Sequence, residues 1–149
     1  APGFIFTTLP PAIVAGAKAS IQYLKESTKE RELQQLNTRL LKNRLAQLDI
    51  PVIPNPSHIA PVFIGETETC KIASDQLLHE RGIYVQSINY PTVAKGEERL
   101  RITPTPGHTE QMTDYLVNVL EKVWRKNDFK KASDWEKELV LALMFQILD

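Results

Sequence analysis

This chain of 149 residues contains one cysteine and few aromatic side chains, and it has no surplus of charge of either sign. The single cysteine, Cys70, excludes an intramolecular disulfide and argues against a zinc site built on thiolates. Eighteen basic side chains balance eighteen acidic ones, so no overall field draws the protein to nucleic acid or to an anionic membrane. No apolar run approaches the roughly 18 residues of a membrane-spanning helix. We therefore expect no nucleic-acid or membrane partner, and we expect Cys70 to be a buried structural thiol.

Apolar periodicity predicts an alternation of helices and strands along the chain. A short strand is expected at 3–8, a helix over 12–25, and a second long helix up to residue 48 that begins with the capping-box pair Ser27 and Glu30. After a proline-rich connector we expect a strand at 57–65, a helix at 66–81 capped by Gly82, strands at 83–88 and 99–103, and a helix at 109–124. Ser133 and Glu136 form a second capping box and predict a helical tail. The order strand, helix, two strands, helix is typical of an α+β layer.

Apolar residues at helical spacing predict which faces of these helices pack into a core. The predicted apolar faces consist of Ile13, Ala17, Ile21 and Leu24; Leu33, Leu36, Leu40, Leu41, Leu45 and Leu48; Ile72, Leu77 and Leu78; and Met112, Leu116, Val119, Leu120 and Val123.

Two arginines stand in the predicted strand at 99–103. Alternation along a strand places Arg99 and Arg101 on one face and turns Leu100 and Ile102 into the core. A guanidinium can hold a carboxylate through two parallel hydrogen bonds, so the pair could clamp an anion beside the Pro/Gly loop at 90–98. From the residues alone, solvated strand arginines are the preferred interpretation, and a plain surface turn remains an alternative for the loop. His58, His79 and His108 have no partner at metal-ligand spacing, and for His108, in the turn Thr105-Pro-Gly-His, we expect a capping role.

The stretch from Gly82 to His108, with Asn89-Tyr-Pro-Thr-Val and Arg99-Leu-Arg-Ile-Thr-Pro, resembles the C-terminal part of the α-oxoamine synthases, which depend on pyridoxal phosphate (PLP). The resemblance implies that Arg101 holds the α-carboxylate of the amino-acid substrate and that the loop at 90–98 closes over the substrates. It also implies that Ile88 excludes water from a succinyl carboxylate and that Thr92 donates a hydrogen bond to it. Lys95 stands where many family members have arginine, so this position keeps a positive charge but lacks the planar fork of a guanidinium.

The same resemblance assigns Thr7 and Thr8 to the PLP phosphate across a homodimer interface, although this chain lacks a serine that follows them in the family. The family's Schiff-base lysine precedes the segment that matches Ala1, so the resemblance assigns no catalytic residue to this chain and predicts that the chain alone is inactive. The implied fold is the C-terminal small domain of a PLP aminotransferase-like enzyme. We expect the end of the large domain and linking helices at 1–50, the small domain at 51–125, and a C-terminal extension at 126–149.

Ile88 and Tyr90-Pro-Thr-Val favour the family members that join glycine to succinyl-CoA, giving 5-aminolevulinate, CoA and CO2 for heme synthesis. Such an enzyme lies in the mitochondrial matrix in eukaryotes and in the cytoplasm in bacteria. Another α-oxoamine synthase and a non-catalytic interaction fragment remain as alternatives.

Overall fold

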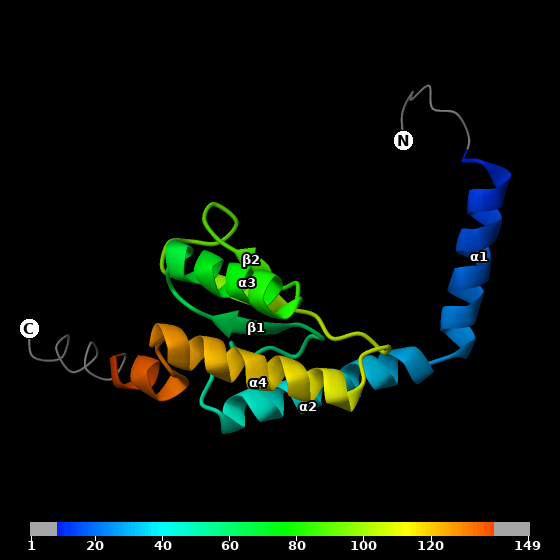
Figure 1. The fold of residues 1–149 in the computed structure, drawn as a ribbon. Helices are drawn as coiled ribbons and strands as arrows, with labels where there is room; N and C mark the ends of the chain where they lie inside the picture. Colours follow the sequence, from blue (N-terminus) through cyan, green and yellow to red (C-terminus); the bar gives the residue numbers. More distant parts are fainter. Residues whose placement is uncertain (1–8, 139–149) are drawn as a thin grey trace, which may run out of the picture.

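A computed structural model describes residues 9–138 of the chain. The helices are α1 (Pro11–Glu26), α2 (Lys29–Gln47), α3 (Thr67–Arg81) and α4 (Glu110–Asn127), and the strands are β1 (Ala60–Phe63), β2 (Gln86–Ile88) and β3 (Arg99–Ile102). These elements confirm the expected α+β class (Figure 1). The strand predicted at 3–8 lies outside the described residues.

The three strands form one antiparallel sheet in which β3 lies between β1 and β2. Arg101 of β3 faces Pro61 on one side and Gln86 on the other, and Arg99 faces Phe63 and Ile88. All three strands are shorter than predicted, β3 by a single residue at its end. β2 begins only at Gln86 because the N–H of Ile83 still closes the end of α3 by donating to the carbonyl of Leu77 (2.9 Å).

Strand β1 begins only at Ala60 because residues 55–57, which precede it, form a bend that is held by side-chain hydrogen bonds. The backbone N–H of Ser57 donates to Oδ1 of Asn55 at 3.0 Å, and the ammonium of Lys42 donates to the carbonyls of both residues. Backbone groups held in such local bonds do not join a ladder.

One face of the sheet, which we call the inner face, carries the core. Leu100 and Ile102 are buried there as predicted. Helix α3 contacts β2 and β3, α2 contacts β1, and α4 packs against both α2 and α3 (Figure 1). The core residues are Leu41, Leu45, Ile50, Ala60, Val62, Ile64, Cys70, Ala73, Leu77, Val85, Leu100, Ile102, Val117, Val119, Leu120, Val123 and Trp124.

Several apolar residues predicted for the core are exposed instead. On α3 the buried stripe runs through Cys70, Ala73 and Leu77, so Ile72 and Leu78 lie beside the stripe rather than in it. On α2 only the C-terminal half packs against α4, which leaves Leu33 and Leu36 exposed. The exposed side chains among the predicted core faces are Ile13, Ala17, Ile21, Leu24, Leu33, Leu36, Ile72, Leu78 and Met112.

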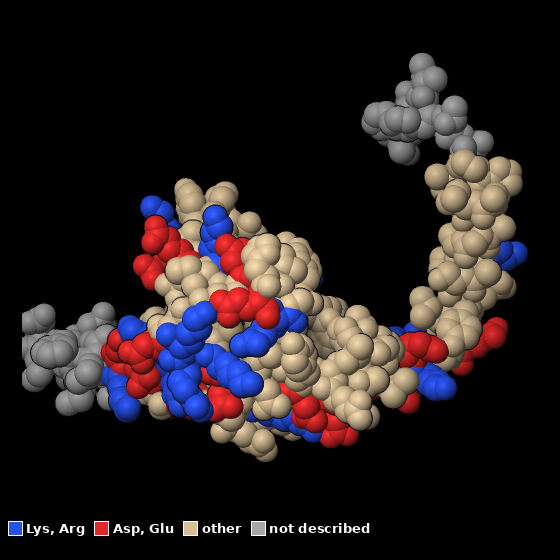
Figure 2. Space-filling view, in the orientation of Figure 1, with Lys and Arg blue, Asp and Glu red and all other residues tan. Residues whose placement is uncertain are grey.

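Helix α1 stands apart from the α+β layers. None of its residues is buried, although its apolar side chains recur at the predicted spacing. Figure 1 shows it extending away from the sheet, and Figure 2 shows that its visible surface is mostly uncharged. The described residues therefore contain no packing partner for this apolar face. The predicted domain boundaries near residues 50 and 125 remain predictions.

The helix ends follow local chemistry, with two departures from the predicted caps. Gly82 ends α3 in the left-handed conformation, with φ of 66°, as expected. Ser27 donates to the Glu30 carboxylate (3.0 Å), and Thr28, rather than Ser27, occupies the N-cap of α2 without a side-chain bond to the backbone. The predicted capping box there is wrong because the two side chains bind each other.

The second predicted capping box is also wrong, because Ser133 is used in a tertiary contact. Its hydroxyl donates to the carboxylate of Asp49 at 2.6 Å, 84 positions away in the sequence, and residues 132–138 are helical. In the same helical segment, the Trp135 ring lies edge-on against the ring of Phe63 in β1, with the two ring centroids 4.9 Å apart. This contact fixes the start of the tail to the edge of the sheet. No helix within residues 9–138 has the length and apolar character needed to cross a bilayer.

Candidate functional site

The outer face of the sheet, opposite α3 and α4, carries the predicted substrate residues. Alternation along β3 turns Arg99 and Arg101 outward, while Leu100 and Ile102 turn inward. On β2 the same alternation places Ile88 on the outer face directly opposite Arg99. The structure thus brings Arg101 and Ile88 to one surface.

The two arginines differ in how they are held. The guanidinium of Arg99 donates through Nε to the carbonyl of Glu97 (2.8 Å) and through Nη2 to its carboxylate (3.2 Å). Arg101 is exposed and makes no hydrogen bond or ion pair with another described residue. Because the guanidinium of Arg99 is engaged and that of Arg101 is not, Arg101 alone, rather than the pair, is available to bind an anion.

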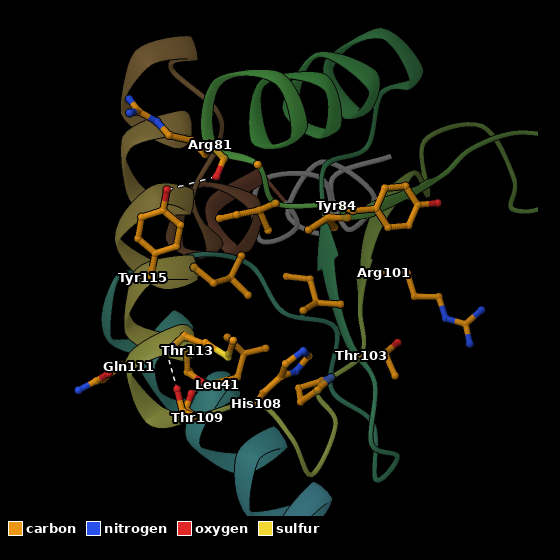
Figure 3. Close-up of a pocket in the computed structure, with 17 residues that line it drawn as sticks. Leu41, Arg81, Tyr84, Arg101, Thr103, His108, Thr109, Gln111, Thr113 and Tyr115 are labelled. Carbon is orange, nitrogen blue, oxygen red and sulfur yellow. Dashed lines mark hydrogen bonds between the residues drawn. The ribbon is translucent and has the colours of Figure 1, made fainter.

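Figure 3 shows the orientation of Arg101 relative to a cavity on the helix-covered side of the sheet. This cavity, of about 680 Å³, opens between the segment 81–85 that leads from α3 to β2, the end of β3 and the start of α4, and its apolar walls include Ile83, Met112 and Leu116. The Arg101 side chain lies at its margin and points away from it, on the side of the sheet opposite α4 (Figure 3). The cavity and the guanidinium are therefore two separate features, and the described residues form only one wall beside Arg101.

The loop between β2 and β3 carries Thr92, the other residue predicted to touch substrate. Its backbone N–H donates to the carbonyl of Asn89 at 2.9 Å, which closes a turn just after β2. The Thr92 side chain is exposed and its hydroxyl makes no hydrogen bond within residues 9–138. Lys95 lies 5.5 Å from the centre of the Tyr90 ring, a cation–π distance, and Gly96 adopts a φ of 88° where the chain turns back toward β3.

The loop ends at a buried carboxylate that sequence reasoning missed. Glu98 is 2% exposed and lies on the inner face, where its side chain accepts hydrogen bonds from the Thr67 hydroxyl (3.0 Å) and from the N–H of Gly96 (2.9 Å). Hydrogen bonding to its own backbone N–H, together with Thr67, Gly96 and nearby Lys95, holds the pKa of Glu98 below its usual value against the opposing effect of burial. The signal that could have found it is the alternation that turns Leu100 inward, because Glu98 lies two residues before Leu100 and therefore points to the same face.

The remaining predicted residues have structural roles or lie outside the described range. Thr7 and Thr8, the candidates for a PLP phosphate, lie outside residues 9–138. His108 supports a turn, because its Nδ1 accepts the N–H of Thr105 at 3.1 Å, and the neighbouring Thr109 is the N-cap of α4. Cys70 is fully buried, as expected, and burial raises the pKa of its thiol to about 11. Within the described residues no three His, Cys, Asp or Glu side chains gather in a way that could hold a metal ion.

The chain belongs to the family of class I and II aminotransferases, which it matches over residues 1–120. It is 60% identical over 139 residues to the mitochondrial 5-aminolevulinate synthase of Neurospora crassa, a match that covers 93% of this chain and 22% of that protein. It is 52% identical over 139 residues to the mitochondrial 5-aminolevulinate synthase of Saccharomyces cerevisiae, covering 93% of this chain and 25% of that protein. The chain therefore spans less than a third of the length of these curated relatives.

Solved structures show the same fold. A structure of SPT with PLP internal aldimine matches with a TM-score of 0.76 at 25% identity, covering 83% of this chain and 31% of that one. The 8-amino-7-oxononanoate synthase of Francisella tularensis matches with a TM-score of 0.68 at 20% identity, covering 81% of this chain and 35% of that one. These matches confirm the small-domain fold of a PLP aminotransferase-like enzyme and the resemblance to the α-oxoamine synthases.

Proposed function

We propose that this chain provides the substrate-carboxylate wall of a 5-aminolevulinate synthase, which condenses glycine with succinyl-CoA to give 5-aminolevulinate, CoA and CO2. The observation that carries the proposal is the exposed guanidinium of Arg101, which has no acidic partner among residues 9–138 and shares its sheet face with Ile88. The sequence supports this synthase over another α-oxoamine synthase, because identity is 52–60% to the named 5-aminolevulinate synthases and 20–25% to the solved neighbours.

Each residue has a role that its position allows. The planar fork of Arg101 donates two hydrogen bonds to the glycine carboxylate, and this fixes the rotation of the glycine α-carbon as well as its place. Ile88 shields the acyl-carboxylate region from water, and the free hydroxyl of Thr92 donates to that carboxylate from the loop. Closure of the loop at 90–98 would bring Thr92 over the substrates and exclude solvent from the reacting atoms.

The cofactor in this proposal is PLP. A free guanidinium on the outer face fits an amino acid presented with its carboxylate toward β3, which is what a PLP site in this fold requires of the small domain. When bound, PLP supplies the electron sink that stabilises the carbanion at the glycine α-carbon. Thr7 and Thr8 would hold its phosphate from a partner subunit of a homodimer. The Schiff-base lysine is assigned to no residue of this chain, so the chain acts together with a segment that supplies it.

The location that follows is the mitochondrial matrix, because the curated relatives that the chain matches are named mitochondrial. Heme synthesis is the process that consumes 5-aminolevulinate.

The test is substitution of Arg101 in the full-length synthase that carries this segment. Arg101→Ala removes a charged bidentate contact of about 1.5–3 kcal/mol, so we expect kcat/KM for glycine to fall by roughly 10- to 150-fold. Arg101→Lys keeps the charge without the fork and should recover only part of the loss. Arg99→Ala is the matched control, since Arg99 shares the face but is bound to Glu97. Equal effects of Arg99→Ala and Arg101→Ala would contradict the assignment. A wild-type protein that binds its partner segment but forms no aminolevulinate would support a non-catalytic interaction role instead.

A further inference from the structure

Glu98 is a charged side chain buried in a place where an apolar one would fill the core. It is 2% exposed, and acidic side chains are seldom buried this far unless they are bound. By the alternation of β3 it shares the inner face with Leu100 and Ile102. The mechanism proposed above does not use it, and no part of it reaches the outer face where substrate would lie.

Four hydrogen bonds show what Glu98 holds together. Its carboxylate accepts from the hydroxyl of Thr67, the first residue of α3, and from the backbone N–H of Gly96 in the loop. Its carbonyl accepts from the N–H groups of Ile64 and Gly65 at 2.9 and 3.0 Å, just beyond β1. One residue thus joins the end of the loop to α3 and to β1.

The opposite end of the loop is held less firmly. At Asn89 the described bonds are backbone turns only, from the N–H groups of Thr92 (2.9 Å) and Val93 (3.4 Å) to one carbonyl. The side chains expected to meet substrate, including Thr92, lie between these two ends. A hydrogen bond to an ionised acceptor is roughly twice as strong as a neutral one, so the Glu98 end dominates the placement of the loop.

We propose that Glu98, at the end of the loop between β2 and β3, is a positioning residue that sets the place of loop residues 89–97 relative to Arg101. The inference rests on the proposed function for its catalytic consequence. Arg101 itself stays in register through the ladders to β1 and β2, so loss of the Glu98 carboxylate displaces the loop without displacing the guanidinium. Loss of the Glu98 carboxylate should therefore impair binding and reaction of the acyl substrate under the loop, and should not impair glycine binding by Arg101.

The experiment compares Glu98→Gln with Glu97→Gln in the full-length synthase. Gln keeps the shape of the side chain and removes its charge. Glu97 is the matched control because it is adjacent and exposed, and because its carboxylate binds only Arg99 among the described residues. For Glu98→Gln we expect KM for succinyl-CoA and kcat to worsen by about tenfold, within the hundredfold that a misplacement of ~1 Å can cost, while KM for glycine stays within about twofold. Glu97→Gln should leave all three near wild type.

A second readout does not depend on turnover. Hydrogen exchange of the amides at 89–97 should accelerate in Glu98→Gln and remain unchanged in Glu97→Gln, whether or not the protein makes aminolevulinate. If the wild-type protein forms no product, the proposed function fails and the exchange result still decides the role of Glu98. Unchanged exchange, or equal losses for glycine and succinyl-CoA, would overturn the inference.

A variant at Thr67 covers the case in which Glu98→Gln does not fold. Thr67→Val removes the hydroxyl that donates to Glu98 and should reproduce a weaker form of the same split between succinyl-CoA and glycine. Thr67→Ser retains the hydroxyl and should restore wild-type values. A Thr67→Val protein with the kinetics and loop exchange of wild type would count against the proposal.

Discussion

Gly65 is the position where the helical start of the tail meets the sheet, and its replacement by alanine tests that contact. A Cβ at residue 65 would lie 3.0 Å from Cη2 and 3.3 Å from Cζ2 of Trp135, and 3.4 Å from Cε1 of Phe63. Gly65 also has a φ of 83°, which alanine adopts only with strain. Two costs therefore add, one from the backbone conformation and one from displacing an indole ring that rests on Phe63.

The backbone cost and the packing cost of Gly65→Ala can be separated by comparison with a second glycine that has a similar φ but no close neighbours. The left-handed conformation costs roughly 1–2 kcal/mol for a residue with a Cβ, and forcing an atom into a packed site costs about 1–3 kcal/mol. Gly82 has a φ of 66°, and a Cβ there would meet no atom within 4 Å. Gly82→Ala should therefore show the first cost alone, and Gly65→Ala both, so that the two variants differ by about 1–3 kcal/mol in the free energy of unfolding.

The assay is urea unfolding of the chain, followed by circular dichroism, for both glycine variants with and without Trp135→Ala. With the indole removed, the excess cost of Gly65→Ala should disappear, because non-additivity is expected only for residues in contact. An equal loss of stability in Gly65→Ala and Gly82→Ala would refute the docking of Trp135 on Gly65. So would an excess that persists after Trp135 is removed.

Three further outcomes follow from burial and capping. Leu120→Ala empties a fully buried site and should destabilise the chain by about 2–5 kcal/mol in urea unfolding. Thr109→Ala removes the N-cap bond to Met112 of α4 and should cost about 1 kcal/mol by the same measurement. Burial raises the pKa of Cys70 from 9.0 to about 11, so stability that is fully present below pH 9 should fall as pH rises toward 11, since the unfolded chain loses the thiol proton first. Cys70→Ala should abolish that part of the alkaline dependence, and a persistent dependence would assign it to another group.

Local rules account for the features that could be predicted from sequence. The outward position of Arg101 follows from the period of two in a strand, and the left-handed cap at Gly82 follows from the absence of a Cβ. Both features are decided within a few residues, so no knowledge of the tertiary fold was needed. The element order followed for the same reason, and strand ends were wrong where Asn55 and Leu77 hold backbone groups in turns.

Features decided by distant residues were not predicted. Ser133 has the spacing of a capping box with Glu136, yet its hydroxyl donates to the carboxylate of Asp49, which follows α2 and is distant in the sequence. The apolar face of α1 was predicted from spacing, but spacing does not say whether a partner covers it. The role of Glu98 required knowing that Thr67 lies beside the end of the loop.

The alternation of β3 links the proposed site to its support. Glu98 and Leu100 face the helices, while Arg99 and Arg101 face outward, so one short strand anchors the loop on its inner face and presents the free guanidinium on its outer face. A shift of one residue would exchange the two faces, burying a guanidinium against α3 and turning Leu100 to the surface. The same register that stabilises the core thus keeps both arginines on the outer face, where Arg99 is bound to Glu97 and Arg101 has no described partner. This argues that the position of Arg101 is a consequence of folding, established before any substrate is bound.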